Sequence, residues 1–569
     1  MKNKGIKGLA LMAIAGVMTT GCDLIKELDY TVTPDPLEMH GDSVRVKVSV
    51  KFPEKGINKK AYAEITPMLG ETALTPITVV GEKATANGTV VQYKTGGTVV
   101  YEDVVAYTPN MKVTSLDVTG KVFKGDKEKA EMEKTKIADA TIVTPLLVNK
   151  DFRVVYAQDK FMRVTEQNYS AAINFLKGRS EVRTAELKDQ DMVDLGAWLA
   201  EEQMNPKLTL KAINLTGFAS IEGEVAKNSN LSTDRATAAK AAIMKMAAGK
   251  KIANEMAQNE ASFSVAGSGE DFDGFKAALE TATDISDSDK QLVLRILETI
   301  KDPSQREQEI KNLGKTFTTL DKNVFPKQRR TEINVVYDKT GYSDEELKAL
   351  SKSNIDTLTV EEILFTATLT DDLNEKLRLY KESARLFSND YRTHNNVGAV
   401  LYMQNKMAEA KVAFEKANNL QENVISLNNL AAVAGVAGDR TKAKALLAGA
   451  SGAGTEVGYN NGILAIQDGD YDAAVSNFGS ESTYNKALAQ LLSNNSSAAV
   501  STIDASADKE TAQGYYLKAI AGARKDNLGD IIDNLKNAFA QDGSYKKMAS
   551  EDREFMKYLE NASFTAIVK

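Results

Sequence analysis

The sequence is poor in the residues that most often carry enzymatic chemistry. Its 569 residues include one cysteine, one tryptophan and two histidines. A single thiol excludes a disulfide framework, and the isolated His40 and His394 are interpreted as packing or surface residues. No phosphate-binding loop, Gly-x-Ser-x-Gly elbow or His-Glu-x-x-His motif is present in the sequence. We therefore expect a non-enzymatic protein that needs no cofactor.

Basic runs and long apolar runs are also scarce. The formal net charge is −7 and the pI is about 5.4. Proteins that bind nucleic acid need a basic face to displace counterions from phosphates, so a nucleic-acid partner is not expected. With 43% hydrophobic and 26% charged residues, the chain has enough apolar surface for several folded domains.

The first residues predict a lipid anchor. Three lysines precede an apolar run over residues 9–17, which is too short to span a membrane and suits a signal peptide. The run ends in Met-Thr-Thr-Gly-Cys, which resembles a lipobox, although Thr19 stands where leucine is more usual. We expect a signal peptide over residues 1–21, a lipidated (palmitate-bearing) Cys22, and an anchor linker over residues 22–28. The alternative is that Cys22 is an ordinary structural thiol.

Residues 29–158 show a period of two. Val44, Val46, Val48 and Val50 alternate with polar residues, which predicts an antiparallel strand with one wet face. Several further β-rich runs, separated by glycine and proline, predict an immunoglobulin-like β-sandwich. A run of charges over residues 126–136 is interpreted as a solvated loop or a short helix.

The stretch over residues 217–236 joins an apolar strand to a helix. Ser232 is predicted to cap that helix, with Asp234 in its first turn. Arg235 would then project beside the loop. Free N–H groups and a guanidinium at one corner favour the binding of a small anion. The simpler interpretation is a capped helix with a solvated arginine.

The same stretch resembles the OmpA-like peptidoglycan-binding domain. That family carries a Gly-x-Thr-Asp-x-x-Gly loop followed by Asn-x-x-Leu-Ser-x-x-Arg-Ala. The matching residues here are Gly217, Gly223, Asn228, Leu231, Ser232, Arg235 and Ala236. The family usually has Asn-Arg-Arg before its last strand, and this chain has Gln328-Arg329-Arg330. The resemblance implies a central α/β domain over residues 168–338, with a helical insertion at about residues 275–320.

The resemblance also implies a ligand, the peptide stem of peptidoglycan. Arg235 matches the arginine that holds the carboxylate of diaminopimelate. Where the family has Thr-Asp, this chain has Ala219 and Ser220, so the aspartate that would pair with the ligand's ammonium is missing. By resemblance the ligand-binding residues are Arg235, Ser220, Gly223, Asn228 and Leu231, and weak or altered binding is expected.

A metal site is not expected. Glu270, Asp271 and Asp273 form an acidic cluster ahead of a glycine. The cluster lacks the regular series of oxygen ligands that defines a calcium loop, so we predict no calcium site there.

The last third of the chain is a repeat array. Gly398, Ala431 and Gly462 recur at intervals of 33 and 31 residues, each after an asparagine-containing motif. Twelve residues past each of them stands an alanine, and four residues further stands Phe414, Leu447 or Phe478. This is the tetratricopeptide (TPR) pattern, in which small residues let two helices approach closely. We predict an all-α TPR solenoid over residues 343–560, with a concave face that binds a protein partner; the alternative is a rigid arm.

The chain as a whole resembles Bacteroidota envelope lipoproteins that join an OmpA-like domain to tetratricopeptide repeats. The expected function is a scaffold on the outer membrane, lipid-anchored and facing the periplasm, that contacts peptidoglycan and a protein partner. The alternative is a subunit of a secretion, fimbrial or outer-membrane assembly complex. In that case the OmpA-like domain has lost its ligand and serves only as an interaction module.

Overall fold

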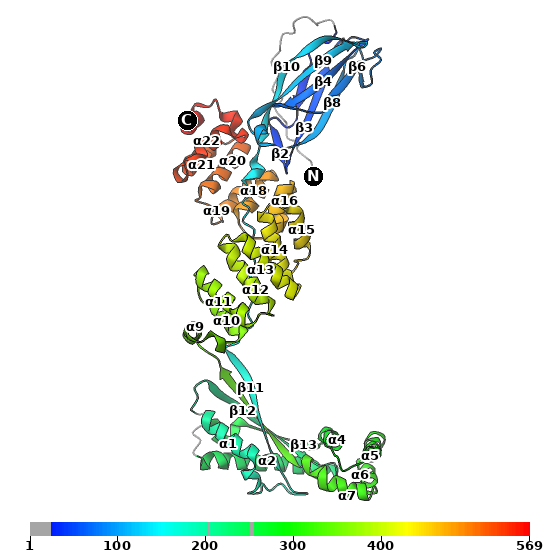
Figure 1. The fold of residues 1–569 in the computed structure, drawn as a ribbon, viewed down its shortest axis with the longest axis vertical. Coiled ribbons are helices and arrows are strands. Elements are labelled where there is room, and N and C mark those ends of the chain that lie inside the picture. The colour runs from blue at the N-terminus through cyan, green and yellow to red at the C-terminus, as the bar shows by residue number, and fades with distance from the viewer. Residues whose placement is uncertain (1–23, 203, 251–254) are drawn as a thin grey trace. The chain divides into compact units, whose positions relative to one another are not determined.

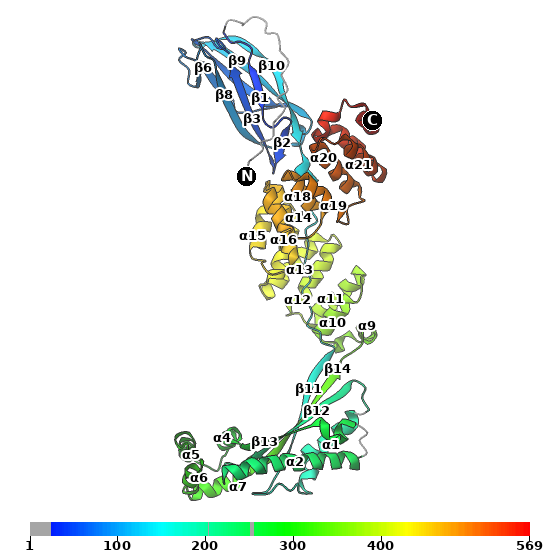
Figure 2. The same cartoon turned by 180° about the vertical axis from the view of Figure 1, so that it is seen from behind.

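The computed structural model describes residues 24–202, 204–250 and 255–569. The predicted signal peptide and Cys22 lie outside the described residues. The chain forms two compact units, one made of residues up to Gln158 together with Thr370–Lys569, the other of Asp159–Leu369. Figures 1 and 2 show the elements of both units from opposite sides.

The N-terminal part of the first unit is rich in β-sheet, as predicted. Its strands are β1 (Asp29–Val32), β2 (Leu37–His40), β3 (Ser43–Phe52), β4 (Ala61–Leu69), β5 (Thr72–Ala73), β6 (Ile77–Gly81), β7 (Thr89–Val91), β8 (Gly97–Ala106), β9 (Thr114–Lys124) and β10 (Lys127–Ile142). They pair in the order β1-β3-β2-β10-β9-β4-β6-β7, with β5 added to β4 and β8 to β3. Val46 and Val48 of β3, Ile65 of β4 and Val118 of β9 lie in one buried core.

The charge run over residues 126–136 is not a loop or helix, so that prediction was wrong. It forms most of β10, which pairs antiparallel with β9. Lys121 forms an ion pair with Glu128, and Lys134 with Asp117. Opposite charges on neighbouring strands stabilise a sheet, so a run without apolar alternation can still be a strand.

The C-terminal part of the first unit is an all-helical solenoid, which confirms that part of the predicted fold. Its helices are α11 (Leu373–Leu386), α12 (Tyr391–Met403), α13 (Met407–Leu420), α14 (Val424–Val436), α15 (Arg440–Ala448), α16 (Thr455–Asp468), α17 (Tyr471–Asn477), α18 (Tyr484–Leu492), α19 (Ser496–Asp504), α20 (Ala512–Arg524), α21 (Leu528–Gln541), α22 (Ser544–Glu551) and α23 (Ala562–Val568). Consecutive helices pack as hairpins along the array (Figure 1).

Each hairpin turns at a residue with positive φ. These residues are Asn405, Gly438, Gly469, Asn494 and Asp526, with φ of 60°, 83°, 82°, 61° and 55°. Asn, Asp and Gly are the residues that most readily adopt this left-handed conformation. Within the hairpins the small residues allow the predicted close approach, because a Cβ at Gly398 would lie 2.6 Å from the ring of Phe414.

The second unit is built on a four-stranded sheet. Its strands are β11 (Val164–Asn174), β12 (Leu208–Ala219), β13 (Phe263–Glu270) and β14 (Arg330–Thr340). They lie in the order β11-β14-β12-β13, with β12 parallel to β13 and antiparallel to β14. Helices α1 (Gln190–Glu202) and α2 (Val225–Gly249) contribute Leu195 and Ile243 to the core over this sheet.

Further helices complete the second unit. Between β13 and β14 lie α4 (Phe272–Glu280), α5 (Asp287–Thr299), α6 (Pro303–Lys311), α7 (Lys315–Asn323) and α8 (Phe325–Gln328). They form a separate small core around Phe275 and Phe325. The short α3 (Glu255–Gln258) precedes β13, and α9 (Asp344–Ser353) and α10 (Val360–Thr368) follow β14.

The predicted start of α2 was wrong. The helix begins at Val225, so Ser232 and Asp234 lie within it rather than at its N-terminus. The hydroxyl of Ser232 donates to the Ser229 carbonyl at 2.7 Å and accepts from the Gly269 N–H at 2.9 Å. Ser232 therefore joins α2 to β13 and does not cap the helix.

Gly217 allows β12 and α2 to approach closely. A Cβ at this position would lie 1.9 Å from the carbonyl oxygen of Ser232. We therefore expect Gly217→Ala to destabilise the second unit by about 1–3 kcal/mol, as overpacking usually does. Hydrogen exchange of the β12 and α2 amides measures the loss. Gly249→Ala, where a Cβ would meet nothing within 4 Å, is the control. Equal exchange in both variants would contradict the prediction.

Candidate functional site

Arg235, the central residue of the predicted ligand corner, is buried inside the second unit. Only 1% of its surface is exposed. Its Nε donates to the Arg179 carbonyl at 3.0 Å, and its two terminal nitrogens donate to Phe218 and Leu176 carbonyls at 2.7 and 3.2 Å. The guanidinium on α2 thus holds the turn at residues 176–179 and the end of β12.

The electrostatic environment of Arg235 reflects this burial. Desolvation and repulsion from Arg329 lower the pKa of Arg235 to about 10, although attraction from Glu222 partly offsets them. Since this pKa is still well above neutral pH, Arg235 remains charged in the folded protein. Its charge is met mainly by carbonyl dipoles.

Asn228 and Ser220 are buried beside the loop that precedes α2. The side-chain amide of Asn228 donates to the carbonyls of Ser220 and Glu222, both at 3.1 Å, and to the carboxylate of Glu270 at 2.9 Å. The Ser220 hydroxyl accepts from Nε of Arg329 at 3.4 Å. These contacts fix the loop, and Ser220 faces Arg329 rather than Arg235.

The two remaining candidate residues are Gly223 and Leu231. Gly223 has a φ of 101°, which favours glycine, and Leu231 is a half-buried residue of α2. Of the five residues predicted from the resemblance, Ser220, Gly223 and Asn228 gather at one loop. Arg235 instead donates to the carbonyls of Leu176, Arg179 and Phe218.

The helices between β13 and β14 supply carboxylates to this corner. Glu307 of α6 accepts from the Gly223 N–H at 2.6 Å. Asp321 of α7 lies 3.0 Å from Arg329, which also pairs with Glu222. The loop N–H that could receive an external anion therefore already has a carboxylate from the same chain.

A second candidate site, not predicted from the sequence, lies in the repeat array. Residues 149–158, which follow the β-rich region, run extended along the repeats and lie against one helix of each successive hairpin. Four asparagines, one from each of four hairpins, form two hydrogen bonds each with the backbone of this segment. We call these four residues the asparagine ladder: Asn396 of α12, Asn429 of α14, Asn460 of α16 and Asn485 of α18.

Each rung of the asparagine ladder has the same geometry. The side-chain oxygen accepts a backbone N–H and the side-chain nitrogen donates to the carbonyl of the same residue. The N–H and carbonyl distances are 2.8 and 2.9 Å for Ala157 on Asn396, 2.7 and 2.8 Å for Val155 on Asn429, 2.7 and 2.8 Å for Arg153 on Asn460, and 2.9 and 2.9 Å for Asn149 on Asn485. An amide side chain can satisfy both groups of one residue because it carries a donor and an acceptor side by side.

The ladder is buried and internally connected. All four asparagines are at most 2% exposed. The preceding asparagine in two repeats supports the next rung, since Asn429 donates to Asn395 and Asn460 donates to Asn428, both at 3.0 Å. Buried amides without such partners would destabilise the array, so the segment and the repeats depend on each other.

The rungs follow the period of an extended strand until Arg153. Ala157, Val155 and Arg153 are two residues apart, whereas the next rung holds Asn149 and skips Asp151. The skipped residue is held through its side chain instead. Its carboxylate accepts from the Tyr459 hydroxyl at 2.8 Å and from Asn485 at 2.9 Å.

Phe152 anchors the segment between rungs. Its side chain is 3% exposed and packs on α14, where a Cβ at Gly435 would lie 2.5 Å from the ring. Tyr402 of α12 donates its hydroxyl to the Phe152 carbonyl at 2.7 Å. We call the space above Gly435 the Phe152 socket. It holds an aromatic side chain, whereas the ladder bonds only to backbone.

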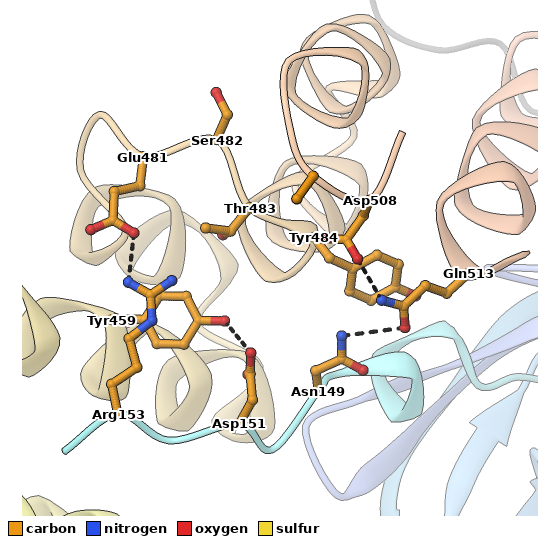
Figure 3. Close-up of a pocket in the computed structure, with 11 residues that line it drawn as sticks. Asn149, Asp151, Arg153, Tyr459, Glu481, Ser482, Thr483, Tyr484, Asp508 and Gln513 are labelled. Carbon is orange, nitrogen blue, oxygen red and sulfur yellow. Dashed lines mark hydrogen bonds and ion pairs between the residues drawn. The ribbon is translucent and has the colours of Figure 1, made fainter. Parts of the chain in front are cut away.

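A polar cavity of about 500 Å³ lies where the ladder skips a residue (Figure 3). Arg153 stacks on the ring of Tyr459 at 3.5 Å and pairs with Glu481 at 2.7 Å on one side. On the other side, Asn149 donates to Gln513 at 3.3 Å. Burial, together with the Asp151 carboxylate, raises the pKa of Tyr459, so its hydroxyl remains the donor to that carboxylate.

The sequence carried a signal for the ladder. Each ladder asparagine lies nine residues before the positive-φ residue of its repeat, a position that Leu517 occupies in the fifth hairpin. Buried asparagine at a fixed repeat position, where TPR helices need only packing, indicates a polar ligand. The sequence did not indicate that the ligand is residues 149–158.

Comparisons with known proteins gave no sequence relatives. No family model matches the chain, and no curated protein matches its sequence. Partial structural similarity was found to the Cut9 and Hcn1 hetero-tetramer of APC/C, with 12% identity, a TM-score of 0.32, and coverage of 40% of this chain and 45% of that one. A tetratricopeptide repeat protein from Parabacteroides merdae is 14% identical with a TM-score of 0.28, and the match covers 37% of this chain and 91% of that one. YrrB, a TPR protein with an unusual peptide-binding site, is 20% identical with a TM-score of 0.22, and the match covers 36% of this chain and 95% of that one.

Neither a cluster of metal ligands nor a membrane-spanning helix occurs among the described residues. Within residues 24–202, 204–250 and 255–569, no three His, Cys, Asp or Glu side chains are grouped so that they could hold a metal ion. Over the same part of the chain, every helix is too short or too polar to cross a bilayer.

Removing one rung tests the asparagine ladder. Asn429→Ala leaves the Val155 N–H without its acceptor, and an unsatisfied buried group costs about 1–3 kcal/mol. We expect amide exchange over residues 153–157 to become about 10- to 100-fold faster, measured by mass spectrometry on the full chain. Asn419→Ala, an exposed asparagine on α13, should leave this exchange unchanged. Unchanged exchange in Asn429→Ala would show that the rung does not hold the segment.

Proposed function

We propose that this chain is a non-enzymatic, lipid-anchored scaffold of the cell envelope. In this proposal it faces the periplasm from the outer membrane and belongs to a secretion, fimbrial or outer-membrane assembly complex. Its central OmpA-like domain acts as an interaction module without a peptidoglycan ligand. The observation that carries the loss of the ligand, and so the choice of this function, is the enclosure of Arg235 by three backbone carbonyls.

The OmpA-like assignment is supported by topology and motif together. From β11 to β14 the order is strand, helix, strand, helices α2 and α3, strand, the inserted helices α4–α8, and the last strand, which lies between β11 and β12. Gln328-Arg329-Arg330 stands at the start of β14, where the resemblance expects it. The proposed lipid anchor is supported by the leader and Cys22.

Loss of the ligand is supported by three features of the corner. Arg235 is 1% exposed, so an external carboxylate would have to displace protein carbonyls to reach it. Ser220, in place of the family aspartate, faces Arg329. Glu307 already accepts from the loop N–H of Gly223. All three act against binding of a zwitterionic diaminopimelate group.

The other candidate function is a link to peptidoglycan with weak or altered binding. It is favoured by the residue match at Asn228, Leu231 and Arg235. It would require α6 to move away from the loop, because Glu307 stands at the Gly223 N–H. The two functions therefore differ in one measurable property, the retention of the folded chain on the cell wall.

Sedimentation with purified peptidoglycan tests the proposal. We expect the full chain to stay in the supernatant, at the level of an unrelated acidic protein, while an OmpA-like domain that retains Thr-Asp in its loop is pelleted.

If the chain does pellet with peptidoglycan, two conservative variants show whether Arg235 is responsible. Arg235→Lys keeps the charge and removes the fork of donors, whereas Arg295→Lys makes the same change at an exposed site on α5. Retention that is lost only in Arg235→Lys, with an unchanged circular dichroism spectrum, would replace the proposed function with the peptidoglycan link.

A further inference from the structure

We propose that the groove of the repeat array is a peptide-binding site whose resident ligand is residues 149–158 of the same chain. This cis ligand closes the groove to external peptides. The inference concerns the first unit alone, so its failure would leave the proposed role of the central domain untouched.

The groove has the chemistry of a peptide site rather than of a packing surface. Four asparagines each pair with both the N–H and the carbonyl of one residue, which recognises an extended backbone of any sequence. A packing surface would need no such pairs, as Leu517 of α20 shows: it occupies the same repeat position beyond the end of the segment and is buried among apolar residues.

Side-chain selectivity comes from two places along the groove. The Phe152 socket admits a ring because Gly435 has no side chain, whereas the same position in the neighbouring repeats holds Tyr402 or Ile466. One residue further along, Tyr459 offers its ring to a cation and Glu481 offers a carboxylate. The preferred ligand is therefore an extended peptide that carries an aromatic residue followed by a basic residue, as Phe152-Arg153 does.

The cis ligand has an advantage over any external peptide. A segment tethered next to its groove acts at an effective concentration on the order of millimolar, so a competitor with the same contacts is excluded at micromolar concentration. A protein partner that used this groove would first have to displace residues 149–158. Release of the segment is thus the step that would make the groove available.

A labelled peptide measures whether the groove is closed. The probe is a fluorescein-labelled peptide with the sequence of residues 147–158, LVNKDFRVVYAQ, followed by fluorescence anisotropy with the full chain. We expect no binding by the natural chain at concentrations up to about 100 µM, because the cis segment outcompetes the probe. Saturable binding by the natural chain in that range would overturn the proposal.

Two variants of the cis segment measure whether the groove can be opened. In the first, residues 149–157 are replaced by glycine and serine at equal length. The second, Phe152→Ala, weakens only the cis ligand, because the probe supplies its own phenylalanine. We expect each folded variant to bind the probe at least 10-fold more tightly than the natural chain does.

Matched controls identify the site of binding. Adding Gly435→Leu to Phe152→Ala fills the Phe152 socket and should abolish the gain, and a probe with alanine at the phenylalanine position should bind at least 10-fold more weakly. If Phe152→Ala keeps its helical circular dichroism and gains no affinity, the proposal is wrong. The same conclusion holds if the gain survives Gly435→Leu.

Discussion

Satisfaction of buried backbone groups is the constraint on which the two candidate sites depend. An extended segment that enters a helical groove brings N–H and carbonyl groups that the helices cannot pair, since their own backbone groups are used internally. The asparagine ladder solves this with one side chain for each paired residue. Each hydrogen bond contributes only about 0.5–1.5 kcal/mol net, yet an unmade one costs more, so every missing rung weakens the attachment of the segment.

The same constraint explains the corner of the central domain. There a guanidinium, Arg235, pairs with three carbonyls, and the carboxylate of Glu307 pairs with an N–H of the loop. In both units, groups suited to an external ligand are satisfied by the chain itself. The groove is occupied by residues 149–158, and the Gly223 N–H at the corner is occupied by the carboxylate of Glu307.

Features that depend on local periodicity could be predicted from the sequence. The repeat intervals of Gly398, Ala431 and Gly462 predicted helical hairpins, and alternation around Val46 predicted a strand. The start of α2 could not be predicted, because Ser232 has the chemistry of a cap but bonds to Gly269 on another element.

Features that depend on residues far apart in the sequence could not be predicted either. The burial of Arg235 depends on the carbonyls of Leu176 and Arg179, more than fifty residues earlier in the chain. The ladder asparagines were visible as a repeated motif, but their ligand precedes them by more than two hundred residues. Periodicity reports which face of an element is buried and says nothing about which distant segment covers it.

The position of the central unit within the chain has a consequence for biosynthesis. Residues 149–158 are translated before the entire second unit, and the rung between Asn149 and Asn485 joins residues 336 positions apart. Whether the chain emerges from the ribosome or from an export channel, the segment appears before Asp159–Leu369 and before its groove, so it is exposed until the repeats fold. Lys150, Asp151 and Arg153 surround Phe152 in this segment, and charges beside apolar residues are the feature that limits aggregation of an exposed strand.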